Sequence, residues 1–325
     1  MKYLSLLTLL PVVVSGYTRG VSFFGFETSA KAVHMLWCNP LQFHINKIAE
    51  IGFNTIRVPI SEDLIMSDWD NTYPQEGIIN PNYPEAHMKS IEVLDYLFDL
   101  TAGKNISILF DIHRLNTDSQ APKPFLDNTV YTFVRFMDAW VKLLDRYHTR
   151  WNLMGIDPFN EYQSDDWNDW SNLAAITINH IEAKFPDRFN YYVEGDRWGG
   201  DLSGVKNKPV NISANVNPRV FYSVHKYWFS DQGCVWDQNC LIQSWNFSFG
   251  YLGDRVMVGE WGYISSDNWQ TQWANWFVDY LKTRNIHDTY FWSWNFDSGD
   301  TKGVLLEDCN NVNQDKIELL HRLWY

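Results

Sequence analysis

Residues 256–295 read VMVGEWGYISSDNWQTQWANWFVDYLKTRNIHDTYFWSWN and combine two short β-rich runs with one helical run. Val256–Glu260 and Thr289–Asn295 are nearly continuous apolar runs, as expected of strands that are covered on both faces in a parallel sheet. Between them, Thr271–Lys282 carries apolar residues at helical spacing. A strand, a helix and a second strand in this order predict one β–α–β unit.

The same alternation of strand and helix patterns continues outward from this unit. Six further strands are predicted at Val21–Glu27, Thr55–Ile60, Ile106–His113, Leu153–Asn160, Tyr191–Glu194 and Val220–Trp228. Further helices are predicted at Leu41–Ile51, Met88–Ala102, Val130–Tyr147, Trp167–Phe185 and Lys316–Trp324. The helix after the fifth strand is poorly marked. Eight strands that alternate with helices favour an α/β fold, a (β/α)8 TIM barrel that forms a single domain over residues 17–325.

A doubly wound open sheet is the alternative arrangement of these elements. Such a sheet usually has a glycine-rich phosphate loop after its first strand, and Gly25-Phe26-Glu27 is not one. In a barrel, catalytic side chains lie at the carboxyl ends of the strands. Polar residues do occur there: Glu27, Arg57, His113, Asn160, Glu161, Glu194, His225, Tyr227 and Glu260. Their placement favours the barrel.

The composition narrows the classes of partner. The formal net charge of −13 argues against nucleic acids and anionic membrane surfaces, which attract basic proteins. It is compatible with a neutral polysaccharide. The 17 tryptophans point the same way, because the C–H face of a pyranose ring packs on an indole; the alternative is a large core with surplus tryptophan.

The amino-terminal segment has the pattern of a secretory signal. Lys2 precedes the apolar run Leu4–Val14, which is too short to span a bilayer, so residues 1–16 are predicted to be a cleaved signal peptide. A first core strand is the alternative. We therefore expect a secreted, extracellular protein, and the sequons at Asn105, Asn211 and Asn246 are compatible with this. Asn105 directly precedes a strand and is expected to be poorly accessible.

Secretion permits disulfide bonds, and the chain has four cysteines. Cys234 and Cys240 are close in sequence and are predicted to pair. Cys38 and Cys309 can pair only if the two ends of the domain meet, and that pairing stays open. The cysteine spacing does not resemble that of a zinc site.

Two glutamates end apolar strands and are the sharpest chemical signal. Glu161 closes the fourth predicted strand, and Glu260 closes the seventh. In a barrel, both carboxyl groups would face the mouth. Two facing carboxyl groups can hydrolyse a glycosidic bond in two steps, one protonating the leaving oxygen and the other attacking the anomeric carbon. The alternative is a pair of surface carboxylates that cap loops.

Several motifs resemble those of glycoside hydrolase family 5, and they extend over almost the whole mature chain. They are Gly20–Thr28, Val33–Trp37, Asn54–Pro59, Asp111–Arg114, Asn160–Glu161, Ser223–Tyr227, Gly259–Gly262 and Phe291–Asp300. The first and last stretches resemble the endo-β-1,4-glucanase branch in particular. One departure is Tyr162, because the family usually has proline after the acid/base glutamate; this puts the geometry of the loop in doubt more than the catalysis.

The resemblance assigns roles to the residues at the strand ends. It implies that Glu161 is the general acid/base, which must be protonated at the first step, and that Glu260 is the nucleophile. Supporting and substrate-binding roles are implied or expected for Arg57, His113, Asn160, His225, Tyr227, Trp292, Trp37 and Trp198. Arg57 and Tyr227 are expected to contact Glu260, Asn160 the sugar 2-hydroxyl, and Trp292 the sugar at the cleavage point. Trp37, Trp198 and also Trp228 are candidates for outer subsites, although simple packing explains each equally well.

The expected function is a secreted, retaining endo-β-1,4-glucanase that acts on β-glucan as a monomer, with no cofactor and no metal. Alternatives are a related β-glycosidase acting on mannan, xyloglucan or β-1,3-glucan, and a carbohydrate-binding pseudoenzyme. A metal-dependent barrel hydrolase would need ligands such as His113 and His225, and no His-x-His cluster supports it. No separate carbohydrate-binding module is expected, so soluble β-glucan should be a better substrate than crystalline cellulose.

Overall fold

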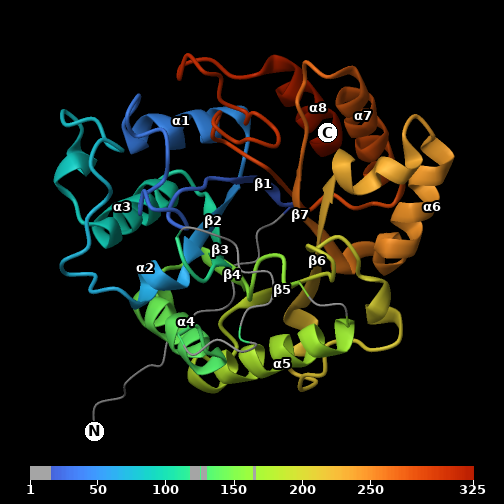
Figure 1. The fold of residues 1–325 in the computed structure, drawn as a ribbon, viewed down its shortest axis with the longest axis horizontal. Helices are drawn as coiled ribbons and strands as arrows, with labels where there is room; N and C mark the ends of the chain where they lie inside the picture. The colour runs from blue at the N-terminus through green and yellow to red at the C-terminus, as the bar shows by residue number, and fades with distance from the viewer. Residues whose placement is uncertain (1–15, 118–124, 126–129, 164–165) are drawn as a thin grey trace, which may run out of the picture.

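The strands form a closed barrel in the order β1 to β8, and each strand is parallel to both neighbours (Figure 1). The computed structural model describes residues 16–325 except 118–124, 126–129 and 164–165. Apart from Gly16, the predicted signal peptide therefore lies outside the described residues. The predicted single-domain (β/α)8 barrel is confirmed.

The strands begin close to their predicted positions, but three of them end early. They are β1 (Arg19–Ser22), β2 (Thr55–Ser61), β3 (Ser107–Arg114), β4 (Leu153–Asp157), β5 (Asn190–Glu194), β6 (Val220–Tyr227), β7 (Val256–Gly262) and β8 (Thr289–Phe291). The predictions for β1, β4 and β8 extended three to five residues too far. Residues beyond these ends, such as Phe26, Phe159 and Trp294, are buried in loops and so prolong the apolar pattern past the last strand pairing.

Helices surround the barrel on its outside (Figure 1). They are α1 (Leu41–Ile51), α2 (Glu62–Met66), α3 (Ser90–Ala102), α4 (Phe133–Tyr147), α5 (Trp167–Lys184), α6 (Gln238–Ser248), α7 (Asn268–Thr283) and α8 (Gln314–Trp324). Short 3-10 turns are η1 (Pro84–His87), η2 (Ser203–Lys206), η3 (Asn217–Arg219), η4 (Trp228–Cys234) and η5 (Gly250–Arg255). Between β5 and β6, residues 195–219 form only η2 and η3, which explains the poorly marked helix there.

Apolar packing divides into two layers that leave the carboxyl ends of the strands polar. The larger layer lies between barrel and helices, and a smaller cluster fills the barrel interior with Leu109, Met154, Tyr192, Met257 and Tyr290. Alternation along β3 then places Asp111 and His113 on the same strand face as Leu109. The interior thus changes from apolar to charged toward the end at which catalytic groups of such barrels lie.

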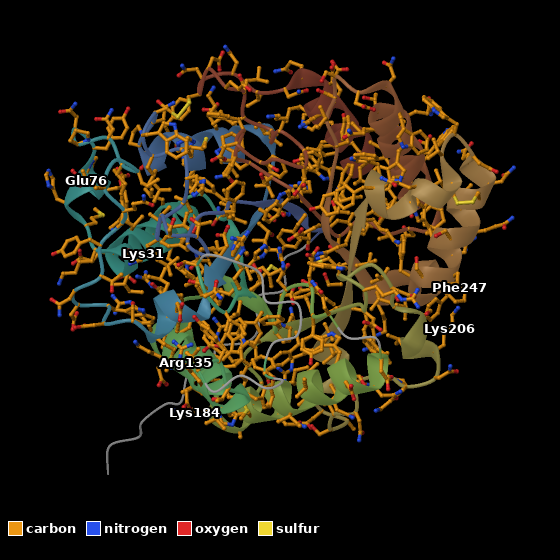
Figure 2. The ribbon with its side chains drawn as sticks, viewed as in Figure 1. Lys31, Glu76, Arg135, Lys184, Lys206 and Phe247 are labelled. Carbon is orange, nitrogen blue, oxygen red and sulfur yellow. A yellow bond between two sulfur atoms is a disulfide. The ribbon has the colours of Figure 1, made fainter. Side chains whose placement is uncertain are left out.

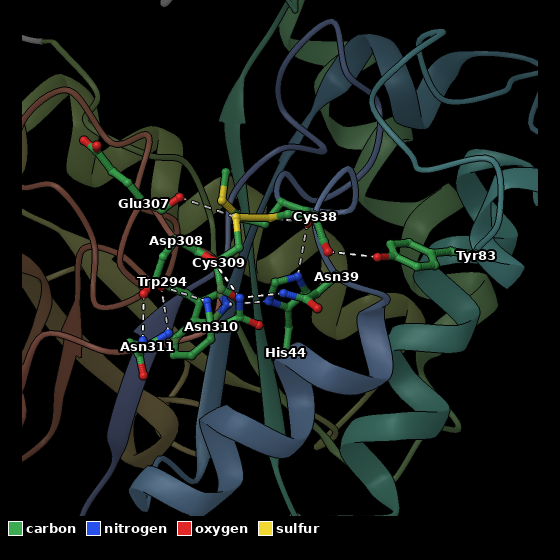
Figure 3. Close-up of a disulfide and its surroundings, with 11 residues drawn as sticks. Cys38, Asn39, His44, Tyr83, Trp294, Glu307, Asp308, Cys309, Asn310 and Asn311 are labelled. Atoms are coloured by element: carbon green, nitrogen blue, oxygen red, sulfur yellow. Dashed lines mark hydrogen bonds between the residues drawn. A yellow bond between two sulfur atoms is a disulfide. The ribbon is translucent and has the colours of Figure 1, made fainter.

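Both disulfides form, and they lie far apart on the molecule (Figure 2). The predicted Cys234–Cys240 pairing is confirmed. Cys38–Cys309 joins the loop after β1 to the loop after β8, and the side chain of Asn39 donates to the Cys309 carbonyl at 2.6 Å (Figure 3). This second pairing, left open by the sequence, follows from barrel closure, which makes β1 and β8 neighbours.

Two of the predicted glycosylation sequons lie at the surface. Asn105 is exposed, contrary to the expectation from its place before β3, because a tight turn with a positive φ of 55° turns it outward. Asn211 is also exposed. Within the described part of the chain, no helix combines the length and apolar character needed to cross a membrane.

Candidate active site

A cleft of about 420 Å³ opens at the carboxyl ends of the strands. It is lined by His113, Arg114, Glu161, Arg197, Trp198, Gly200, His225, Tyr227, Phe229, Ser230, Glu260, Trp292 and Asp300. Most of the residues predicted from strand ends lie here. Arg197, Phe229 and Asp300 were not predicted, because they lie outside the strands, at positions that depend on the folded chain. Arg114 ends β3 next to the predicted His113 and was not predicted either.

Glu260 on β7 is held by donors from two other strands. Arg57 on β2 donates through Nη1 to Oε1, and the Tyr227 hydroxyl donates to Oε2 at 2.7 Å. Burial raises the pKa of the Glu260 carboxyl above its usual value, although the positive charges of His225 and Arg57 oppose this rise. Both oxygens of this carboxylate therefore have a fixed orientation.

Simple alternation along β7 does not explain why Glu260 faces the interior. Met257 belongs to the interior cluster, and Glu260 follows it by three residues, so a regular strand would turn Glu260 outward. The register of β7 against β8 shifts between Val258 and Trp261. Its register against β6 also shifts, between Val224 and His225 of β6. These irregularities bring Glu260 into the cleft, consistent with the frequent use of bulges beside active sites.

Glu161 lies just after β4 in a strained turn. Its φ is 48°, and its backbone N–H donates to Oε2 of Glu194 at 2.6 Å, which fixes the turn. The next residue, Tyr162, is buried and stacks on Trp170 at 4.9 Å. Tyr162 thus anchors the loop onto α5, at the position where the family motif usually has proline.

The two predicted catalytic carboxyl groups face each other across the cleft. One oxygen of Glu161, one oxygen of Glu260 and one ring nitrogen of His225 all lie within 4.8 Å of one another. Nδ1 of His225 is 3.1 Å from Oε1 of Glu161 and 3.7 Å from Oε2 of Glu260. The Glu161 side chain is 17% exposed, so a substrate can reach it.

Arg57 is the centre of a buried network that the sequence revealed only in part. Its Nη2 donates to Oδ1 of Asn160 at 2.9 Å. Both residues were predicted to lie together at the carboxyl ends of the strands. The same nitrogen lies 3.2 Å from both Asp111 and Glu194 and 3.3 Å from Asp157. Glu194 was among the polar residues predicted at strand ends, whereas Asp111 and Asp157 were not predicted as site residues.

The carboxylates around His225 determine its charge. Burial alone would lower the pKa of His225, but Glu194 and Glu260 raise it well above its usual value. In turn, burial raises the pKa of Glu194, but the charges of His225 and Arg57 bring it down to about 2. Burial and the Glu194 charge raise the pKa of Asp157 well above its usual range. The neighbouring charges thus favour the protonated form of His225 and the ionised form of Glu194, and burial favours the protonated form of Asp157.

His113 and Trp292 form one wall of the cleft. Nδ1 of His113 lies 2.7 Å from Asp111, and Nε2 lies 3.5 Å from the Asn160 amide. The His113 ring stacks on Trp292 with centroids 5.4 Å apart and an interplanar angle of 7°. Trp292 also stacks on Phe24, with centroids 5.4 Å apart. These contacts fix the orientation of Trp292, which is half-buried and lines the cleft, and it stays a candidate for the sugar platform.

The three other tryptophans predicted near the cleft have different positions. Trp198 lines the cleft and is 50% exposed. Trp37 is half-buried outside the lining, where its ring is 5.8 Å from that of His34. Trp228 packs against Phe229 at 5.8 Å, and its indole nitrogen is buried. Trp198 and Trp37 remain candidates for sugar contacts, whereas Trp228 has a packing position.

Among the described residues, two groups of side chains have the spacing of a metal site, namely Asp157, Glu194 and His225, and Glu161, His225 and Glu260. Both include His225, whose Nδ1 lies 3.1 Å from Glu161 and whose Nε2 lies 3.1 Å from Glu194. Arg57 already contacts Asp157, Glu194 and Glu260 and supplies the positive charge that a metal would provide. The donor set therefore fits a buried ion-pair network better than a metal centre.

A TIM barrel that presents two facing carboxyl groups after β4 and β7 has the architecture of a glycoside hydrolase. The family model described as cellulase, glycosyl hydrolase family 5, matches residues 14–298. The chain therefore belongs to glycosyl hydrolase family 5.

Individual relatives agree with this membership. The chain is 30% identical over 336 residues to an endoglucanase of Paenibacillus polymyxa, covering 94% of this chain and 82% of the relative. The catalytic domain of the major endoglucanase of Xanthomonas campestris pv. campestris superposes with a TM-score of 0.85 at 26% identity, over 95% of this chain and 94% of that one. An endocellulase variant of Pyrococcus horikoshii in complex with cellotetraose gives 0.84 at 26% identity, over 95% and 93%.

Proposed function

We propose that this protein is a secreted endo-β-1,4-glucanase that hydrolyses β-glucan with retention of configuration, with Glu161 as general acid/base and Glu260 as nucleophile. The observation that carries the proposal is the separation of the two carboxyl groups, whose nearest oxygens lie within 4.8 Å. Retaining glycosidases have carboxyl groups roughly 5–5.5 Å apart, whereas inverting enzymes need roughly 6.5–9.5 Å to admit water.

In the first step, Glu161 donates its proton to the glycosidic oxygen while Glu260 attacks the anomeric carbon from the opposite face. The bond to the leaving sugar breaks, and a glycosyl ester forms on Glu260. Arg57 and Tyr227 hold the attacking carboxylate, so little reorganisation is needed at the moment of attack. Asn160, fixed by Arg57, is proposed to bind the sugar 2-hydroxyl, a contact that strengthens in the transition state.

In the second step, the ionised Glu161 removes a proton from water, and the resulting hydroxide displaces Glu260 from the sugar. His225 supports both steps, because its Nδ1 lies between the two carboxyl groups. Its positive charge reduces their mutual repulsion while both are ionised. Glu194 holds the opposite side of the ring, with Oε1 3.1 Å from Nε2.

The substrate and the location rest on different observations. The names of relatives, including an endocellulase bound to cellotetraose, favour a β-1,4-glucan as substrate. The net charge of −13 favours a neutral polymer over an anionic one. The signal-like residues 1–16 and the two disulfides favour secretion, and the relative from Xanthomonas campestris is named a major extracellular endoglucanase.

Trapping the glycosyl ester tests the nucleophile. A 2-fluoro cellobioside with a good leaving group should inactivate the enzyme, because the fluorine slows the second step more than the first. Mass spectrometry of the peptides should then find the label on Glu260, and Glu260→Gln should abolish both labelling and turnover. A label on Glu161 or Glu194 would show that the nucleophile has been assigned wrongly.

The stereochemistry gives an independent control. NMR of the first product of wild-type hydrolysis should show the β-anomer, because two displacements retain configuration. An initial α-anomer would exclude the covalent mechanism. A protein that binds cellobiosides without hydrolysing them would instead be a carbohydrate-binding pseudoenzyme.

A further inference from the structure

A tryptophan outside the catalytic cleft is exposed and has an unusual backbone conformation. Trp236 lies inside the loop closed by the Cys234–Cys240 disulfide, just before α6. It is 57% exposed and has a φ of 59°. A bulky residue in this left-handed region is a genuine outlier. The disulfide loop holds this conformation and keeps the indole in solvent.

Two tryptophans of α7 extend the surface from Trp236. The Trp269 ring lies 5.0 Å from that of Trp236, and the Trp276 ring lies 6.1 Å from that of Trp269. Trp269 and Trp276 are seven residues apart, or about two turns, and so share one face of the helix. Both are partly buried against the core. We call Trp236, Trp269 and Trp276 the tryptophan row.

The tryptophan row continues into a groove between α6 and α7 of about 330 Å³. The groove is lined by Gln238, Ile242, Trp276, Asp279, Tyr280, Thr283 and Arg284. Trp276 belongs to both the row and the groove. The surface therefore combines indole rings with amide, carboxylate, hydroxyl and guanidinium groups, which together suit a ring that has an apolar face and a rim of hydroxyls.

Trp198 supports a binding role for this surface. It is 50% exposed, has a φ of 60° and lines the catalytic cleft. Trp236 shares its exposure and its backbone strain but lies outside the cleft lining. Strain of this kind persists where the surrounding structure maintains it, often at ligand sites. An exposed indole on a residue with a positive φ thus occurs at two places on the molecule.

We propose that the tryptophan row and its groove form a second binding surface for a β-glucan chain. The identity of the ligand rests on the proposed function. The surface is linked to the cleft by η4, because Phe229 and Ser230 of η4 line the cleft and Cys234 at its end begins the loop. The negative net charge disfavours an anionic polymer, and a neutral glucan matches the indole faces. This surface retains the polymer while the cleft cleaves it.

The test measures glucan binding in the full-length Glu260→Gln background, which prevents hydrolysis. Native electrophoresis through gels that contain barley β-glucan gives the retardation of each variant. Adding Trp236→Ala should weaken retardation severalfold, and Trp236→Phe should keep most of it because a ring remains. The matched control is Trp151→Ala, since Trp151 is 42% exposed but precedes β4 at the opposite end of the barrel; its retardation should not change.

Kinetics separate this proposal from the catalytic one. In the active enzyme, Trp236→Ala should leave kcat and KM for an aryl cellobioside unchanged and raise KM for the polymer. Equal retardation of Trp236→Ala and Trp151→Ala would overturn the second surface even if the enzyme cleaves glucan. A change of oligomeric state in Trp236→Ala, without loss of retardation, would also overturn it and identify the row as a contact between copies. Failure of the wild type to hydrolyse any glucan would instead refute the proposed function.

Discussion

His225 contacts every carboxyl group on which the proposed mechanism depends. Its Nδ1 lies between Glu161 and Glu260, and its Nε2 lies 3.1 Å from Glu194. Without a positive charge here, two facing carboxylates would repel each other and raise each other's proton affinity. Because Glu194 and Glu260 keep His225 protonated, the imidazolium allows the two catalytic groups to lie close together.

Replacing Glu161 by alanine should separate the two steps of the reaction. A glucan has a poor leaving group and should lose about 10²–10⁴-fold in rate without general acid catalysis. An aryl cellobioside needs little protonation, so its first step should survive and its second step should become limiting. Azide, which needs no general base, should then restore turnover and give a β-glycosyl azide. Initial rates and product NMR measure both effects.

The pH profile and a second carboxyl group control this experiment. The wild type needs an ionised Glu260 and a protonated Glu161, so its rate should fall at both low and high pH, with the pair treated as coupled. Glu161→Ala should lose only the fall at high pH. Asp300 also lines the cleft, and Asp300→Ala should show no azide rescue. Equal losses on both substrates, with no azide effect, would contradict the assignment of Glu161.

The sequence identified the residues of the cleft better than those beneath it. Glu161, Glu260 and Arg57 could be found because each lies in or shortly after a strand within a motif. Asp111 and Asp157 could not, because both lie within strands that are buried on both faces and so show no alternation. Which of their carboxyl groups meets Arg57 depends on strand register, and the register shifts between β3 and β4 are invisible in the sequence.

Among the helices and strands, hydrophobic periodicity predicted those in which the pattern is strong. Helix α1 was predicted with its observed bounds, because Gly52, with a φ of 106°, ends it. Helix α6 was not predicted, since its large buried residues are only Leu241 and Trp245 within a run rich in amides and hydroxyls. The five-residue α2 is too short for periodicity to reveal. Packing on the barrel rather than local pattern therefore decides these weaker helices.

The two disulfides should contribute unequally to stability. Cys38–Cys309 closes a loop with a sequence separation of 271, and Cys234–Cys240 one of only 6. Chain entropy then assigns about 5.6 kcal/mol to the first and about 2 kcal/mol to the second. Urea unfolding of Cys38→Ser/Cys309→Ser should show the larger loss in the free energy of unfolding. Cys234→Ser/Cys240→Ser is the matched control, and an equal or larger loss there would contradict the entropic account.

The net charge of the whole molecule should affect its relative activity on anionic and neutral polymers. A net charge of −13 repels carboxymethylcellulose at long range but not a neutral glucan. Raising the ionic strength from about 0.01 to about 0.15 M shortens the screening length from about 30 to about 8 Å. The value of kcat/KM for carboxymethylcellulose should therefore rise, while that for barley β-glucan stays nearly constant. Reducing-sugar assays at several salt concentrations measure this.

Barley β-glucan serves as the control for general effects of salt on the enzyme. If both polymers respond equally, the salt acts on the protein itself. If carboxymethylcellulose activity falls as salt is added, local positive charges in the cleft, such as Arg114 and Arg197, outweigh the net charge.

The pairing of β1 with β8 has a consequence for how each molecule is made. The backbone N–H of Thr18 bonds Asp288 at 2.6 Å, although the two residues are 270 positions apart. A ribosome that adds roughly 5–20 residues per second needs roughly 15 to 50 seconds to synthesise that span. During this interval β1 presents an unpaired edge, the kind of surface on which other chains add strands. This edge stays open to such additions until β8 emerges and pairs with β1.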